Sequence, residues 1–211
     1  MGGVLVDVRA GTATTGATAA PSVTTTAAGV FAFANLAPGS YTLLATLTGF
    51  APVNVTVTVS AGQPTPVTIA MPPVGTAGIS IVLTWGAIPS DLDSYLIMPG
   101  GLGTIWWNNL GNCLGTPFAC LVNDETSPNS SEFTNVTQLS SGTYTFRVND
   151  YVNAYVNNAL AATDLSRSNA RVDVFVSGVL QRTFTVPSQA GVTWTVFTLS
   201  GSITAPTITA V

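Results

Sequence analysis

The chain has 211 residues, of which 46% are hydrophobic and only 7% are charged, and its formal net charge is −4 with no His. Soluble domains usually carry roughly 25% charged residues, so this surface must consist largely of hydroxyl and amide side chains. The five basic residues are all Arg and are scattered along the chain, which excludes a nucleic-acid-binding protein, because phosphate neutralisation requires a basic patch.

The N-terminal part is predicted to form short β-strands. Between residues 54 and 60, NVTVTVS places Val55, Val57 and Val59 on one face and polar side chains on the other. This alternation is typical of strands with one face against a core. Turn sequences such as APGS and SAGQP recur at intervals of about ten residues, which favours sandwiches over βαβ units.

A change in composition divides the chain at AMPPVGTAG, residues 70–78. All four Trp and both Cys follow this segment. We therefore predict an all-β fold of two tandem β-sandwich domains, residues 1–73 and 74–211, the second with an extended C-terminal strand. No apolar stretch approaches the roughly 18 residues of a membrane-spanning helix.

The second part shows the same alternation. YTFRVND (144–150) and RVDVFV (171–176) each place alternate apolar residues on one face. The only helical pattern is NNALAATDLSRS (157–168), with Asp164 or Ser166 as candidate N-caps. A loop is the alternative for this segment.

The pattern G-x-F-x-F-x-N-L-x-P-G-x-Y, followed by Gly49–Phe50, covers the middle of the first part. It is filled by Gly29, Phe31, Phe33, Asn35, Leu36, Pro38, Gly39 and Tyr41. Residues 2–73 thereby resemble the carboxypeptidase regulatory-like family, which implies a small transthyretin-like or Ig-like sandwich that is mostly non-catalytic. The segment before Gly29 is shorter than that family leads us to expect, so one strand is expected to be short, missing or supplied from elsewhere.

Residues 78–204 resemble the YfaP-like group of exported bacterial domains, whose function is not established. The resemblance rests on LTWGAIPSDLDSYL, NDETSPNSSEF, GTYTFRVNDY and TFTVPSQAGVTWTVFTLSGSI. It implies a larger jelly-roll-like or Ig-like sandwich. Two places depart from the pattern: Tyr95 stands where a His is common, and SSE at 130–132 replaces a triplet like G-P-E.

Carboxylates gather in predicted loops of the second domain. Asp91 and Asp93 lie in one loop, Asp124 and Glu125 in another, and Glu132 follows. Because Ca²⁺ takes six to eight oxygen ligands, which loops supply readily, a Ca²⁺ site formed by Asp91, Asp93, Asp124 and Glu132 is one interpretation. The alternative is that Asp91 forms an Asx turn and Asp93 faces solvent.

No catalytic residues are predicted. The chain has no His or Lys to serve as a general base, and it contains no G-x-S-x-G elbow. Two carboxylates at the right separation would suit a glycosidase, and spacing in the sequence alone does not exclude that use of Asp91 and Asp93. We expect a protein that is not an enzyme.

The adjacent Trp106 and Trp107 allow two interpretations. On a strand they would face opposite sides, and an exposed ring beside Asn108 and Asn109 could stack on a sugar, as in a carbohydrate-binding or adhesive module. The alternative is that one ring lies in the core and the other under a loop or subunit. Trp85 and Trp194 are expected in the core.

Cysteines and glycosylation motifs indicate export. Cys113 and Cys120 are predicted to form a local disulfide, since a pair without His lacks the four ligands of a structural zinc site, and disulfides persist in oxidising compartments. Three glycosylation motifs begin at Asn54, Asn129 and Asn135. MGGVLVDVRA lacks the features of a signal peptide, so the chain is expected to be in its mature form.

The scarcity of charge predicts self-association. Monomeric sheet proteins protect their edges with charge, particularly Lys, and this chain has no Lys. Both ends are almost uncharged and extended in character, and a terminal strand can complete a neighbour's sheet. We therefore expect a structural subunit of an extracellular filament, sheath or surface layer, with copies of itself as partner, Ca²⁺ as candidate ion and surface polysaccharide as an alternative partner.

Overall fold

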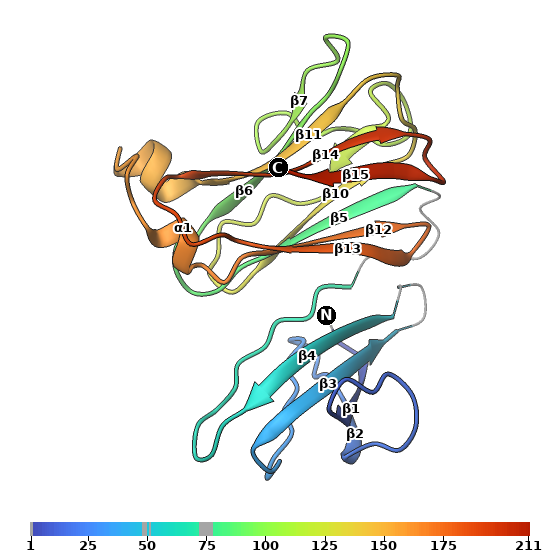
Figure 1. The fold of residues 1–211 in the computed structure, drawn as a ribbon, viewed down its shortest axis with the longest axis vertical. Helices are drawn as coiled ribbons and strands as arrows, with labels where there is room; N and C mark the ends of the chain where they lie inside the picture. The colour runs from blue at the N-terminus through green and yellow to red at the C-terminus, as the bar shows by residue number, and fades with distance from the viewer. Residues whose placement is uncertain (1, 48–49, 51, 72–77) are drawn as a thin grey trace. The chain divides into compact units, whose positions relative to one another are not determined.

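The computed structural model describes residues 2–47, 50, 52–71 and 78–211. Contacts divide the chain into two compact units, Met1–Val74 and Gly75–Val211. The predicted domain boundary, between residues 73 and 74, lies outside the described residues. Nearly all regular structure in both units is β (Figure 1), as the alternating sequence patterns predict.

The first unit contains one antiparallel sheet with the strand order β2-β1-β3-β4. Its strands are β1 (Leu5–Ala10), β2 (Ala20–Thr24), β3 (Gly39–Thr46) and β4 (Val53–Val59). The alternation predicted in β4 is confirmed, since Val55 is buried and its neighbours Asn54 and Thr56 are exposed. One face of the sheet therefore carries the core of this unit.

Two segments without strand structure, 26–38 and 60–71, accompany this sheet. Phe31 and Phe33 from the first segment are in edge-to-face contact at 6.2 Å between ring centroids. Together with Leu43 and Val57 of the sheet they line a groove of about 740 Å³. The segment that carries the predicted aromatic pattern adds no strand to the sheet. The expectation of a short or missing strand concerned the residues before Gly29, and there β2 is an edge strand of five residues.

The second unit is a sandwich of two sheets. The six-stranded sheet has the order β13-β12-β5-β10-β9-β8, and the five-stranded sheet has the order β15-β14-β11-β6-β7. Strands of the first sheet are β5 (Ile79–Thr84), β8 (Gly111–Asn112), β9 (Ala119–Leu121), β10 (Ser131–Val136), β12 (Arg171–Val176) and β13 (Val179–Thr185). Strands of the second are β6 (Leu92–Ile97), β7 (Thr104–Ile105), β11 (Tyr144–Asp150), β14 (Thr193–Gly201) and β15 (Pro206–Ala210).

Apolar side chains from both sheets form the core of the sandwich. Phe146 and Phe197 are fully buried and stack at 5.3 Å. Phe184, on the edge strand β13, stacks on the other side of Phe197 at 5.3 Å. Trp85 and Trp194 are 2% and 5% exposed, so the prediction that both lie in the core is confirmed.

Helical structure is confined to the connection between β11 and β12. A π-helical turn, η1 (Val152–Val156), follows β11, and α1 (Asp164–Arg167) is one short turn. The helical pattern predicted for 157–168 is therefore realised only in its last part. Neither predicted cap is correct, because Thr163 occupies the N-cap and makes no side-chain capping bond.

The two terminal strands pair inside their own units. β1 lies between β2 and β3 and is bonded on both edges, whereas β15 is bonded only to β14 and forms an edge of its sheet. Within the described residues, no helix has the length and apolar character needed to span a membrane.

Candidate metal centre

Four predicted ligand residues come from three places in the sandwich of the second unit. Asp91 immediately precedes β6, Asp93 is the second residue of β6, Asp124 follows β9, and Glu132 lies in β10. Strands β6 and β10 belong to different sheets. The fold thereby brings together carboxylates that are up to 41 positions apart in the sequence (132 − 91).

Three of these carboxylates form a compact group. One oxygen from each of Asp93, Asp124 and Glu132 lies within 4.8 Å of the others. Glu132 is 0% and Asp93 2% exposed, whereas Asp124 is exposed at the rim. The prediction that Asp93 faces solvent is therefore wrong, and the alternative of a shared site gains direct geometric support.

The buried carboxylates are only partly satisfied by hydrogen bonds. Glu132 accepts a bond from the backbone N–H of Ser94 at 2.8 Å and a longer one from that of Glu125 at 3.4 Å. In contrast, Oδ1 of Asp91 and Oδ2 of Asp93 are buried and have no hydrogen-bond partner among the described residues. A buried carboxylate oxygen without a donor is costly, so these two atoms indicate a missing positive ligand or proton.

Burial and mutual repulsion disfavour the charged forms of this group. Burial, together with the charges of Asp124 and Asp150, raises the pKa of Asp91 to about 6. Burial and the neighbouring Asp91, Asp124 and Asp150 raise the pKa of Asp93 to about 8. Burial also raises the pKa of Glu132 well above its usual range. The raised pKa values of these carboxyls favour a bound proton or a cation in this group.

Asp150 is a member of this neighbourhood that the sequence reasoning missed. It ends β11 and is 0% exposed. Its carboxylate accepts bonds from the backbone N–H of Asn153 at 3.0 Å and from the side-chain amide of Asn153 at 2.7 Å. Its position as the last residue of the alternating strand YTFRVND was the available signal, because β11 pairs with β6 and places Asn149 opposite Asp93.

The donor set suits a hard cation. The three clustered groups offer only carboxylate oxygens, and the nearby Asp91 adds a fourth carboxylate, one oxygen of which has no hydrogen-bond partner among the described residues. Oxygen-only sets bind Ca²⁺, Mg²⁺ or Mn²⁺, while zinc and copper sites use His or Cys. Asp91 and Asp124 lie in loops, whereas Asp93 and Glu132 lie in strands. Ca²⁺ accepts such an irregular set of ligands more readily than Mg²⁺, which requires nearly octahedral coordination.

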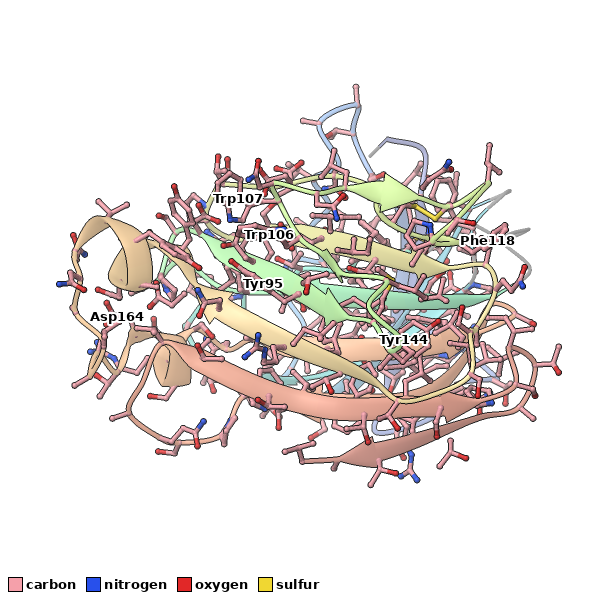
Figure 2. The ribbon with its side chains drawn as sticks, turned by 90° about the horizontal axis from the view of Figure 1, so that it is seen from above. Tyr95, Trp106, Trp107, Phe118, Tyr144 and Asp164 are labelled. Atoms are coloured by element: carbon pink, nitrogen blue, oxygen red, sulfur yellow. A yellow bond between two sulfur atoms is a disulfide. The ribbon has the colours of Figure 1, made fainter. Side chains whose placement is uncertain are left out.

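Trp106 and Trp107 lie close to this centre but not on opposite faces of a strand. β7 ends at Ile105, and Trp106 forms an isolated β-bridge with Asn109 across a tight turn. The two rings are half-buried and touch each other at 5.1 Å, in an edge-to-face arrangement. Figure 2 shows both near Tyr95 on β6. The expectation that one of them would enter the core is wrong.

The remaining predicted sites differ in their environment. Cys113 and Cys120 form the predicted disulfide, with 5.1 Å between their Cα atoms. Asn54 and Asn129 are exposed, and glycosylation there stays a prediction. Asn135 is 5% exposed within β10; the prediction of a glycan at this position is wrong for the folded chain, because the sheet leaves no room for it.

Comparison with known proteins assigns the first unit. Residues 3–72 match the model of the carboxypeptidase regulatory-like domain. The N-terminal resemblance is thus confirmed. No curated protein and no solved structure matches the chain. The resemblance of residues 78–204 to the YfaP-like group stays a prediction.

Proposed function

We propose that the protein is a structural subunit of an extracellular filament, sheath or surface layer. Copies of the chain join through β-strand addition at sheet edges and through packing of the sandwiches. A Ca²⁺ ion held by Asp93, Asp124 and Glu132 stabilises the second unit. No chemistry at a substrate is part of this role.

The observation that carries the proposal is the lack of charge on the open edges. The three sheets end in six edge strands, β2, β4, β13, β8, β15 and β7. Arg182 on β13 is their one charged residue. Edges of monomeric proteins are usually protected by charge, Pro or bulges. Here the protection consists of Pro21 in β2, Pro206 in β15 and a register shift in each of β2 and β13. Edges of this kind are suited to pairing with another chain.

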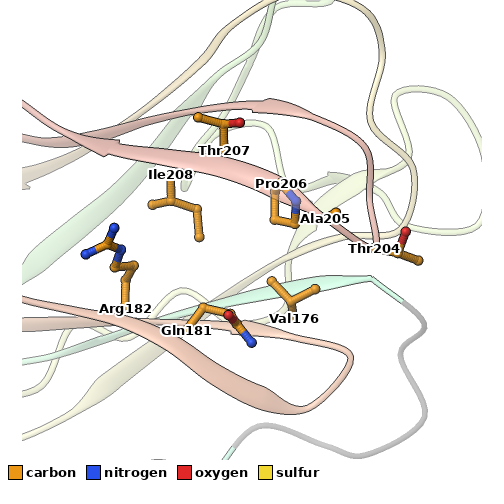
Figure 3. Close-up of a pocket in the computed structure, with 8 residues that line it drawn as sticks. All are labelled: Val176, Gln181, Arg182, Thr204, Ala205, Pro206, Thr207 and Ile208. Carbon is orange, nitrogen blue, oxygen red and sulfur yellow. The ribbon is translucent and has the colours of Figure 1, made fainter.

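One acceptor surface lies between the edge strands β13 and β15. A hollow of about 500 Å³ separates them, and a second one of about 440 Å³ adjoins it. Figure 3 shows Arg182 and Ile208 pointing into this gap from the two strands. Val179 and Leu180 of β13 are exposed beside it. A strand from a second copy would bond to either edge and cover these apolar side chains.

The pairing of the termini limits which strand can be donated. β1 is bonded on both edges, so its donation would require the first unit to open. β15 has only one neighbour, β14, and its other edge is open. Exchange of β15 between copies, or addition at its free edge, is therefore the form of assembly that we propose.

The extracellular location is supported by the disulfide between Cys113 and Cys120. Disulfides are rare in reducing compartments and common in secreted proteins. Surfaces that are poor in charge also favour association over dispersion at high concentration. Both properties suit a protein that works as a building material outside the cell.

Charged edge variants test the proposal. Thr207→Lys and Thr209→Lys each place an ammonium group at an exposed position of β15. Another strand could then pair with β15 only if the ammonium group lost its hydration water. Ser141→Lys adds the same charge on an exposed bend before β11, which is a central strand of its sheet. We expect the wild type and Ser141→Lys to sediment as polymers and both edge variants to stay in the supernatant. Polymers that are unaffected by the edge variants would refute addition at β15.

A further inference from the structure

Five aromatic side chains form a closed ring on the second unit. Successive ring centroids lie 5.4 Å apart for Tyr95–Trp106, 5.1 Å for Trp106–Trp107, 6.0 Å for Trp107–Tyr151 and 5.2 Å for Tyr151–Tyr155. The hydroxyls of Tyr155 and Tyr95 close the ring at 3.2 Å. The five residues come from β6, from the turn after β7 and from the segment around η1. Figure 2 labels three of them, Tyr95, Trp106 and Trp107, which lie near one another.

This ring is not part of the hydrophobic core. Tyr155 is 56% exposed, and the other four residues are half-buried. The core of the unit contains Trp85, Trp194 and the stacked Phe residues instead. Large aromatic side chains that contact one another and stay partly exposed to solvent are typical of binding surfaces. Each such side chain has an apolar part and a part that stays in contact with water.

A small hollow lies against the ring on the outer face of the five-stranded sheet. It has a volume of about 180 Å³ and is lined by Tyr95, Arg147, Asn149, Tyr155 and Thr193. Arg147 is paired with Tyr95 across β11 and β6, and Asn149 is paired with Thr193 across β11 and β14. The volume is below the roughly 300 to 1,000 Å³ of pockets for drug-sized ligands, so it suits a single small ring.

Arg147 gives this hollow its chemical character. Its Nε is buried and has no hydrogen-bond partner, and no ion pair involves it among the described residues. None of the five lining residues is acidic. The register of β11 against β14 shifts between Phe146 and Arg147, with the extra residue, Val196, on β14, and such bulges are common next to binding sites. A guanidinium without an ion-pair partner favours the binding of an anionic group in the hollow, because it can donate two parallel hydrogen bonds to that group.

We propose that this surface binds an acidic saccharide, with one sugar carboxylate on Arg147 and the apolar face of a sugar ring on Tyr155 and Tyr95. The amide of Asn149 and the hydroxyl of Thr193 take the sugar hydroxyls. A nucleic acid is a poor occupant, since Arg147 is the one basic residue of the hollow and the chain carries a net charge of −4. A purely apolar partner would leave Arg147 buried and unpaired.

The adjacent carboxylates set the conditions for the measurement. Asp93 is two residues from Tyr95 on the same face of β6, and its carboxyl opposes an anionic ligand when it is deprotonated and has no cation. A cation in the metal centre removes this opposition, so binding is measured in buffer with Ca²⁺. The proposal does not depend on polymer formation, because the hollow lies within one unit of one chain.

The experiment uses the full chain and two pairs of variants. Wild-type protein is screened on an array of acidic and neutral glycans, and hits are titrated as soluble oligosaccharides, with the fluorescence of Trp106 and Trp107 as a readout. Arg147→Gln and Tyr155→Ala remove the two main contacts. Arg167→Gln removes the same charge at an exposed position of α1, and Val156→Ala shortens the exposed neighbour of Tyr155. Melting curves show that each variant is folded.

We expect glycans with uronic or sialic acids to bind and neutral glycans of equal length to bind at least tenfold more weakly. Arg147→Gln and Tyr155→Ala should each weaken binding at least tenfold, which is about 1.4 kcal/mol, while both control variants bind as the wild type does. The absence of any acidic glycan among the hits would overturn the proposal. Equal affinity for neutral glycans, or binding that Arg147→Gln leaves unchanged, would overturn it as well.

Discussion

The backbone N–H of Ser94 in β6 donates a 2.8 Å hydrogen bond to Oε2 of Glu132 in β10. This bond crosses from the five-stranded to the six-stranded sheet, and Glu132 is fully buried where it accepts it. The carboxylate group of the metal centre therefore lies where the two layers of the sandwich meet. Any ligand that neutralises it acts on the stability of the whole second unit.

Ca²⁺ is expected to stabilise the second unit against heat. A ligand at a hundred times its dissociation constant adds about 2.7 kcal/mol to the free energy of unfolding, which corresponds to a rise in Tm of about 5 to 10 °C for a chain of this size. Asp93→Asn should abolish the rise. Asp7→Asn, an equal charge change in the first unit, should preserve it. A Tm that EDTA and Ca²⁺ leave unchanged in the wild type would contradict a structural ion.

The metal-free protein is expected to lose stability as the pH rises. The pKa values of Asp91 and Asp93 are raised to about 6 and about 8 in the folded chain, whereas an unfolded Asp titrates near 3.9. Between these values the folded chain binds more protons than the unfolded chain, so the free energy of unfolding falls with pH.

Melting curves in EDTA between about pH 4 and about pH 8 check this dependence. The Tm of the wild type should fall as the pH rises across this range. The fall should be smaller for Asp93→Asn, because this variant has no titrating group at position 93. Added Ca²⁺ should have its largest effect at the alkaline end, since the ion binds the deprotonated carboxylates. A Tm in EDTA that rises with pH would show that these groups are not the dominant ones.

Much of the fold was predictable because the strands are strongly alternating. Tyr144, Phe146 and Val148 are all 0% exposed. This is expected of alternate residues in a strand that packs one face against a core. The connection after β11 was not predictable in the same way. Asn153 in its π-helical turn, Val152–Val156, bonds to Asp150 three positions before it and to Asp164 eleven positions after it, and the alternating strand pattern reports neither contact.

The metal centre was predictable in its members but not in its geometry. The scarcity of acidic residues made Asp91, Asp93, Asp124 and Glu132 conspicuous in the sequence. Burial of Asp93 and Glu132 depends on the pairing of β6 and β10 with other strands, which the sequence does not state. The aromatic ring was missed for a related reason, because its five members are brought together from three separate segments.

The disulfide is expected to stabilise the loop between β8 and β9. Cys113 and Cys120 are separated by seven positions, and the chain-entropy model gives about 2.5 kcal/mol for so short a loop. Replacing both residues by Ser should lower the free energy of unfolding of the second unit by about that amount in a denaturant titration. Unchanged stability in the double variant would mean that the loop is already ordered by its strands.

Electron microscopy of the purified full chain is the most direct test of the claim that copies of the chain assemble through their edge strands, which carry almost no charge. At increasing protein concentration, with Ca²⁺ present, we predict ordered filaments or sheets in which backbone hydrogen bonds run from β15 or β13 of one copy to a strand of the next. Fields of separate single molecules at every concentration would contradict the account.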